Sequence, residues 1–144
     1  MEIVKSVTIN KSATDVFSYV SDFSNHKDIF SMNIDARQDT EGPVCVGTRM
    51  TTVAKFLGKP LEDHFVVTEF ELNRKITKKS LPESTVPSSD TVVLEPVDAQ
   101  TTNVRWYLYA EPKGYFKIFG PLLKPMVSRV LAKDLLKLKK LLES

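Results

Sequence analysis

GYFKIFGPLLKPMVSRVLAKDLLKLKKLLES, residues 114–144, is the stretch that decides the fold. At about 100° per residue its apolar side chains fall on one stripe, which is the pattern of an amphipathic helix. One long helix of this kind needs an apolar surface to lie on, and a sheet of several strands supplies one. The residues on this stripe are Phe116, Phe119, Leu123, Val127, Val130, Leu131, Leu138 and Leu141.

The front of this helix contains two prolines. Pro121 suits a first helical turn, but Pro125 lacks a backbone donor and clashes with the turn before it. We therefore expect a break or kink between Gly114 and Pro125, with residues 115–119 forming a separate turn. This segment is either a lid, whose two phenylalanines close a cavity mouth, or an irregular start to the helix.

The residues before this stretch are mostly typical of strands. Residues 3–9 alternate between two faces, and so do residues 102–110. Asn10 or Ser12 can cap a helix over residues 13–20. A second short helical turn is expected at residues 25–30, and further strands at residues 32–38, 46–56, 62–70, 75–81 and 90–97.

Short connections between these strands favour antiparallel pairing. The expected fold class is α+β, with one strand, two short helices, about six more strands and then the long helix. No linker, repeat or low-complexity tract divides the chain, so residues 1–144 are expected to form a single domain.

The composition limits the classes of function. Hydrophobic residues make up 42% of the chain and charged residues 26%, as in ordinary globular proteins. A net charge of +2 gives no general case for nucleic-acid binding. The lone Cys45 excludes an intrachain disulfide, no apolar run approaches the ~20 residues of a membrane span, and residues 1–10 do not resemble a signal peptide. The expected location is cytoplasmic.

The charge is unevenly distributed along the chain. Residues 115–144 contain seven Lys or Arg and two acidic residues, a net charge of +5, which leaves −3 for the rest. This excess is either a solvated helix face or a basic face that meets a membrane surface or an acidic partner. Reversing the charge of Lys133 and Lys140 separates these two interpretations.

Five segments carry a resemblance to a known superfamily: VTINKSATDVFSYVSDFSN at residues 7–25, the Val46-Gly47-Thr48 step, VTEFELNRKIT at residues 67–77, TTNVRWYLY at residues 101–109, and LKKLLE near the end. In this order they resemble the START-like, or SRPBCC, helix-grip superfamily, which includes polyketide cyclases and START lipid-transfer domains. The resemblance covers essentially the whole chain. Many cyclase-like members carry a tryptophan after the Asp-Phe step, where residues 26–30 offer only Ile29 and Phe30.

The resemblance implies a curved antiparallel sheet of six to seven strands wrapped around the C-terminal helix. Members commonly hold a lipid, sterol, polyketide or other apolar molecule between sheet and helix. Side chains that point inward would then line a cavity, although a packed core has the same composition. The expected ligand-binding residues are Met50, Thr52, Ala54, Phe56, Phe65, Val67, Trp106, Leu108, Phe116, Phe119, Leu123, Val127 and Val130.

Asp134 is the polar exception on the apolar stripe, between Leu131 and Leu138. A carboxylate in that position is costly unless it is paired or hydrogen-bonded. Asp134 is therefore either a polar ligand anchor or an acid/base group with a raised pKa, or it occupies a rim position or pairs with a strand Arg or Lys, such as Arg49 or Arg105.

The two histidines are further candidates. His64 lies on an expected strand and is the second candidate for catalysis, while His26 lies between the short helices, where capping is the expected role. No His or Cys pair has metal-ligand spacing, and no glycine-rich phosphate loop is present, so neither a metal nor another cofactor is expected. Tyr107 and Tyr109 are expected on the outer sheet face, with a dimer contact as one role.

We therefore expect a binder or carrier of a small hydrophobic molecule, such as a lipid, a polyketide-like or an isoprenoid-like compound. The protein would act as a monomer or homodimer, and without nucleic acid. The first alternative is a cyclase or dehydratase that uses Asp134, a histidine or a tyrosine. The second is a protein- or membrane-interaction module.

Overall fold

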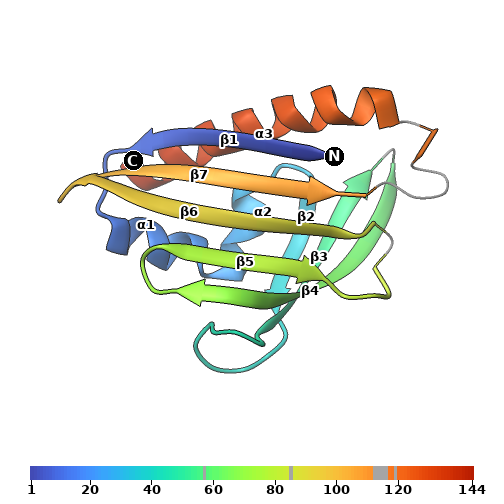
Figure 1. Cartoon of the computed structure of the whole chain (residues 1–144), viewed down its shortest axis with the longest axis horizontal. Helices are drawn as coiled ribbons and strands as arrows, with labels where there is room; N and C mark the ends of the chain where they lie inside the picture. The colour runs from blue at the N-terminus through green and yellow to red at the C-terminus, as the bar shows by residue number, and fades with distance from the viewer. Residues whose placement is uncertain (57, 85, 112–116, 119) are drawn as a thin grey trace.

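The computed structural model describes residues 1–56, 58–84, 86–111, 117–118 and 120–144. Within this part, a curved antiparallel sheet and one long helix dominate the architecture (Figure 1). The elements in chain order are β1 (Glu2–Ile9), α1 (Ala13–Val20), η1 (Phe23–Asn25), α2 (His26–Ile29), β2 (Asn33–Gln38), β3 (Arg49–Phe56), β4 (Lys59–Glu71), β5 (Lys75–Ser80), β6 (Ser88–Asp98), β7 (Thr101–Ala110) and α3 (Gly120–Glu143).

The seven strands among the described residues have the order β1-β7-β6-β5-β4-β3-β2, and every neighbouring pair is antiparallel. Register shifts interrupt three of the ladders, and such bulges bend a strand and increase its twist. The sheet curls into a half-barrel, with α3 beside β1 (Figure 1). The predicted α+β helix-grip fold is confirmed.

The short helices form where the sequence predicts them. Ser12 caps α1, and its hydroxyl accepts a hydrogen bond from the backbone N–H of Asp15 at 3.2 Å. The apolar face of α1 is buried, so the helix is fixed to the sheet by packing as well as by its cap. The second predicted turn, at residues 25–30, corresponds to α2; η1 precedes it, and both contact β2.

The C-terminal end of α3 is tied to the end of β1. The Lys139 ammonium donates to the Thr8 carbonyl at 2.8 Å and to the Glu143 carboxylate at 2.6 Å. The same Glu143 carboxylate accepts a hydrogen bond from the Asn10 backbone N–H at 2.8 Å. No helix in the described ranges is long and apolar enough to cross a membrane.

The break or kink expected between Gly114 and Pro125 does not fall within residues 120–125, since α3 runs from Gly120 through Pro125 without interruption. The hydrogen bond that Pro125 cannot make would go to the carbonyl of Pro121, four residues earlier. Both prolines are exposed, so water can satisfy that carbonyl at little cost. Most of the predicted separate turn, including Phe116 and Phe119, lies outside the described residues.

Two further expectations need correction. Leu141 is 40% exposed and does not belong to the buried stripe, whereas Leu135 is fully buried on it. The third strand begins at Arg49, three residues later than expected, because Gly47 adopts a positive φ of 94° and the chain turns there. The Thr48 backbone N–H donates to the Cys45 carbonyl at 3.0 Å and closes that turn.

Candidate ligand-binding site

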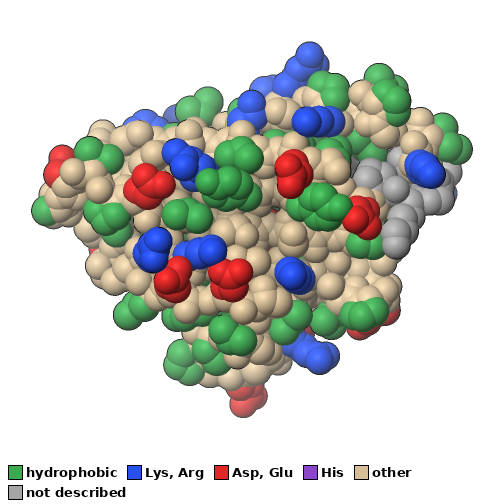
Figure 2. Space-filling model, viewed as in Figure 1, with side chains coloured by type: hydrophobic (Ala, Val, Ile, Leu, Met, Phe, Trp, Pro, Cys, Tyr) green, Lys and Arg blue, Asp and Glu red, His purple; other side chains and the backbone are tan. Residues whose placement is uncertain are grey.

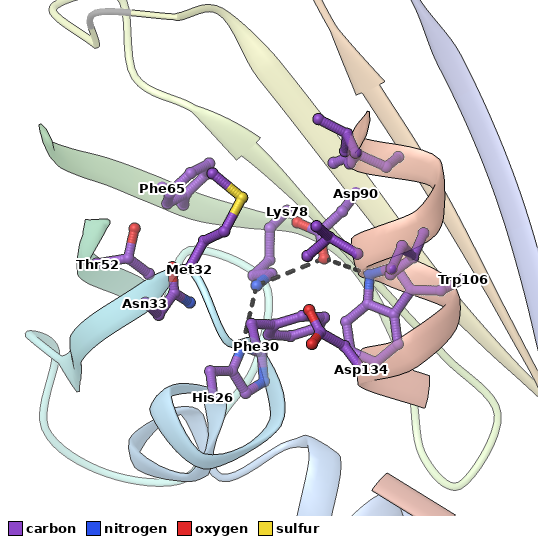
Figure 3. Close-up of a pocket in the computed structure, with 14 residues that line it drawn as sticks. His26, Phe30, Met32, Asn33, Thr52, Phe65, Lys78, Asp90, Trp106 and Asp134 are labelled. Carbon is purple, nitrogen blue, oxygen red and sulfur yellow. Dashed lines mark hydrogen bonds and ion pairs between the residues drawn. The ribbon is translucent and has the colours of Figure 1, made fainter. Parts of the chain in front are cut away.

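A pocket of about 180 Å³ lies between the concave face of the sheet and α3 (Figure 3). It is bounded by α2 and the start of β2 on one side and by the middle of α3 on the other. The residues that line it are His26, Phe30, Met32, Asn33, Thr52, Phe65, Lys78, Asp90, Trp106, Leu108, Val127, Val130, Leu131 and Asp134.

The walls of the pocket are mainly apolar and aromatic. Phe30 and Trp106 meet edge to face, with ring centroids 4.9 Å apart and an interplanar angle of 78°. Trp106 and Leu108 both point inward because they are two residues apart on β7. On α3 the lining residues Val127, Val130, Leu131 and Asp134 recur at the three- and four-residue spacing of one helical face.

Lys78 brings a buried ammonium into this apolar pocket. Its Nζ lies 3.5 Å from a carboxylate oxygen of Asp90, 3.5 Å from Nδ1 of His26 and 3.4 Å from the sulfur of Met50. Charge-assisted N–H···O contacts are normally about 2.7–2.9 Å long. The contact with Asp90 is therefore long, the one with the His26 nitrogen is at the limit of a hydrogen bond, and a thioether sulfur is only a weak acceptor. The ammonium can exchange one of these weak contacts for a closer oxygen acceptor from the pocket side.

Asp90 is the counter-ion of Lys78 and holds Trp106 in place. The same oxygen, Oδ2, accepts a hydrogen bond from the indole N–H of Trp106 at 3.0 Å. β6 and β7 are paired neighbours, so this contact crosses between adjacent strands. Figure 3 shows the chain of contacts from His26 through Lys78 and Asp90 to Trp106.

His26 serves both the fold and the pocket. Its Nε2 donates to the carbonyl of Val20, the last residue of α1, at 2.9 Å, because a carbonyl can only accept. Its pKa is lowered to about 3, first by burial and then by the Lys78 ammonium, against a smaller opposing effect of the Val20 hydrogen bond. The ring is therefore neutral near pH 7, with Nδ1 as an acceptor facing Lys78. The expected capping role is present, but the sequence did not place this histidine in a pocket.

Asp134 lies on the opposite wall, on α3, and is 4% exposed. Its Oδ1 accepts a hydrogen bond from the Ser31 backbone N–H at 3.3 Å. Burial raises the pKa of this carboxyl, although the Ser31 hydrogen bonds and Lys137 act in the other direction. The expected ion pair with Arg49 or Arg105 is wrong: Arg105 pairs with Glu95 at 3.6 Å, and Arg49 lines a separate hollow.

Comparison with protein families identifies the family to which this chain belongs. Residues 1–143 match the profile of the family described as polyketide cyclase / dehydrase and lipid transport. The chain belongs to this family. The predicted resemblance to the START-like superfamily is thereby confirmed. No curated protein matched the sequence.

Solved structures show the same fold at low sequence identity. The Zhui aromatase/cyclase from Streptomyces sp. R1128 has a TM-score of 0.81 at 17% identity, covering 99% of this chain and 93% of that one. A START superfamily protein from Mycobacterium smegmatis has a TM-score of 0.72 at 19% identity, with 99% and 94% covered. A conserved protein from Geobacillus kaustophilus reaches 0.78 at 14% identity, with 99% and 95% covered.

The predicted site residues divide into three groups in this family member. Met50, Val67 and Leu123 are buried but do not line the pocket, and Ala54 does not line it either. Phe116, Phe119 and the side chain of Phe56 lie outside the described part. The predicted residues that the structure brings together at the pocket are Thr52, Phe65, Trp106, Leu108, Val127, Val130 and Asp134.

His64 lies away from this pocket, in the small hollow with Arg49. Its Nδ1 is 2.8 Å from the hydroxyl of Thr51, and that hydroxyl donates to Asp39 at 2.5 Å. Thr51 is buried, so its hydroxyl joins the two strands and the preceding loop. Nothing in this arrangement brings His64 to Asp134, the other predicted catalytic candidate.

The sequence reasoning missed Lys78 and Asp90. A signal for both was present: Ile76 and Lys78 share one face of β5, and Asp90 shares a face with Val92 on β6. An ionisable residue on the same strand face as buried apolar residues indicates a buried charge. In the described part of the chain, no three His, Cys, Asp or Glu side chains come together in a way that could hold a metal ion.

Proposed function

We propose that this protein binds a small, mainly apolar molecule through an oxygen atom that carries full or partial negative charge. The observation that carries the proposal is the Lys78 ammonium, which is buried in an apolar pocket with its Asp90 and His26 partners both 3.5 Å away and a weakly accepting sulfur as its third contact. A carboxylate, enolate or carbonyl oxygen of a ligand would give this ammonium the close partner that the described residues do not supply.

The size of the pocket limits the ligand. An apolar cavity of about 150 Å³ accommodates benzene, and the pocket here is about 180 Å³. The volume fits a molecule of one or two rings, or the end of a longer chain. Contact with Phe30, Phe65 and Trp106 would bury the apolar surface of the ligand. Each Å² buried contributes roughly 25 cal/mol to the free energy of binding.

Calorimetric titration with matched ligands tests this proposal. Benzoate and 2-naphthoate are compared with toluene and 2-methylnaphthalene, which have similar shape but no oxygen. We expect at least one carboxylate to bind about tenfold or more tightly than its hydrocarbon counterpart, because only the carboxylate pairs with Lys78. Equal affinity within each pair, or no binding of any of the four, would contradict the proposal.

Variants of Lys78 give the matched control. Lys78→Met keeps the length of the side chain and removes its charge, and Lys79→Met makes the same change at the exposed neighbouring position. The carboxylate preference should disappear in the first variant and persist in the second. Lys78→Met combined with Asp90→Asn removes both buried charges and leaves no unpaired one. If this folded variant also loses the carboxylate preference, the loss comes from the missing ammonium and not from unfolding.

Acid–base catalysis on such a ligand is the second candidate function. The observation that favours it is that Lys78, His26 and Asp134 converge on one pocket, and that burial raises the pKa of Asp134. A raised pKa makes a carboxylate a stronger base nearer to neutral pH. Asp134 would remove a proton from carbon next to a ligand carbonyl, and Lys78 would stabilise the enolate oxygen.

Deuterium exchange in a bound 1,3-diketone tests this second function. Exchange at the central carbon, followed by NMR, should be faster with the protein than with buffer alone. Asp134→Asn should abolish the acceleration while the diketone still binds. Acceleration that survives in Asp134→Asn would exclude this carboxyl as the base.

A further inference from the structure

The outward side of the first half of α3 carries exposed apolar and basic side chains together. Leu122 is 70% exposed and Met126 38% exposed, and Ile118, just before the helix, is 76% exposed. These three are four residues apart in sequence. Residues four apart lie on the same side of a helix, so Leu122 and Met126 form a continuous apolar strip. The basic residues exposed around them are Lys117, next to Ile118 in the chain, and Arg129 and Lys133, which follow Met126 on the same side of α3.

The charge around this strip has a single sign. Residues 112–133 contain five Lys or Arg and no Asp or Glu, whereas the rest of the chain has a net charge of −3. In Figure 2, basic and hydrophobic side chains lie next to one another along the upper edge of the molecule, over α3. We call Ile118, Leu122, Met126, Lys117, Arg129 and Lys133 the outer α3 patch.

The outer α3 patch lies on the same helical turns as the pocket. Val127 and Val130 line the pocket, and their chain neighbours Met126 and Arg129 belong to the patch. A surface that covers the patch would therefore lie next to the α3 wall of the pocket. The opposite end of α3 is tied down by Lys139 and Glu143 to the end of β1.

We propose that the outer α3 patch docks on the surface of an anionic lipid membrane. Exposed Leu, Ile and Met side chains can enter the boundary between headgroups and acyl chains, while Lys and Arg remain at the level of the headgroups. The absence of acidic residues from residues 112–133 removes repulsion from a negative surface. Docking in this orientation would place α3, which forms one wall of the pocket, against the bilayer.

Sedimentation with lipid vesicles tests the docking. One set of vesicles is phosphatidylcholine, and the other is one part phosphatidylglycerol to two parts phosphatidylcholine. We expect the protein to sediment with the anionic vesicles, to be released by high salt, and to remain in solution with the neutral vesicles. No sedimentation with the anionic vesicles, or equal sedimentation with both sets, would overturn the proposal. If the true partner were an acidic protein instead of lipid, the protein would not sediment with the anionic vesicles.

Two double variants locate the surface that docks. Each basic side chain near an anionic surface contributes roughly fivefold to partitioning onto the membrane, so Arg129→Gln with Lys133→Gln should weaken that partitioning roughly 25-fold. Leu122→Gln with Met126→Gln should weaken it by about tenfold or more, because these side chains would no longer enter the membrane. All four side chains are exposed, so neither double variant disturbs the core.

The matched controls lie at the opposite end of the molecule, at the turn between β4 and β5 (Figure 1). Leu72→Gln changes an apolar residue that is 72% exposed, and Arg74→Gln with Lys75→Gln removes two basic charges. These controls should partition like the unchanged protein. If they lose as much binding as the patch variants, only the net charge or the overall hydrophobicity matters, and the proposed surface is wrong.

Discussion

Lys78 and Asp90 form a buried ion pair whose two halves depend on each other. Removing one partner leaves the other charge buried with less compensation. Lys78→Met should lower the free energy of unfolding by about 2–3 kcal/mol, since Asp90 keeps only the Trp106 donor among the contacts described above. Adding Asp90→Asn should recover most of that loss. Urea denaturation of the two variants measures both effects, and an equally destabilised double variant would show that packing, not charge, is responsible.

His26 makes folding stability depend on pH. Its pKa is about 3 in the folded protein and 6.5 in the ordinary, unfolded state. Between these values the unfolded chain binds a proton that the native protein does not bind. The contribution of the neutral His26 ring to the free energy of unfolding is therefore present above pH 6.5 and is lost progressively as the pH falls toward 3. Between pH 6.5 and pH 5 the loss should be about 2 kcal/mol.

His26→Gln isolates this contribution from that of the carboxyl groups. The amide of Gln can still donate to the Val20 carbonyl, but it does not titrate. Urea denaturation at several pH values should give a shallower decline below pH 6.5 for this variant than for the unchanged protein. Parallel declines would mean that His26 is protonated in the folded state near pH 6, contrary to its buried position beside Lys78.

At the scale of the element, α3 is held by its inward face. Leu138 is fully buried in the core, and Leu136, two residues earlier, is 61% exposed. Leu138→Ala should lower the free energy of unfolding by about 2–5 kcal/mol, because it leaves a cavity between helix and sheet. Leu136→Ala should change it by less than about 0.5 kcal/mol. If thermal or urea denaturation gave similar losses for Leu138→Ala and Leu136→Ala, α3 would not pack against the sheet through the face that the structure shows.

The sequence predicted those elements whose local signals agree with their packing. The helix α1 and the strand β7 combine a cap or a clear alternation with a buried apolar face, and their boundaries were predicted to within one residue. Pro125 does not interrupt α3, because the helix-breaking tendency of proline is local, whereas packing of the later turns holds the helix together. The start of β3 was missed because the positive φ of Gly47 is not visible in a hydrophobic pattern.

At the scale of the whole molecule, the pocket exists because the sheet curls around α3. Its walls combine residues from α2, β2, β3, β4, β5, β6, β7 and α3. Alternation identified Trp106 and Leu108, and helical spacing identified Asp134. The meeting of Lys78, Asp90 and His26 depends on how strands far apart in sequence pair, and the volume depends on how closely α3 approaches the sheet. Neither can be read from a single sequence.

Binding in this pocket should stabilise the whole fold, because the unfolded chain has no such pocket. At a ligand concentration of one hundred times Kd, the free energy of unfolding should rise by about 2.7 kcal/mol. Urea denaturation with and without 2-naphthoate measures this increase. The combined variant Lys78→Met with Asp90→Asn should show a much smaller increase at the same ligand concentration. An equal increase would place the binding site away from Lys78.

The most direct test of the account is a crystal structure of the protein with 2-naphthoate bound. We expect the rings between Trp106, Phe65 and Val127, and one carboxylate oxygen about 2.7–2.9 Å from Nζ of Lys78. A carboxylate that points to solvent, or a ligand bound outside the pocket between the sheet and α3, would contradict the account.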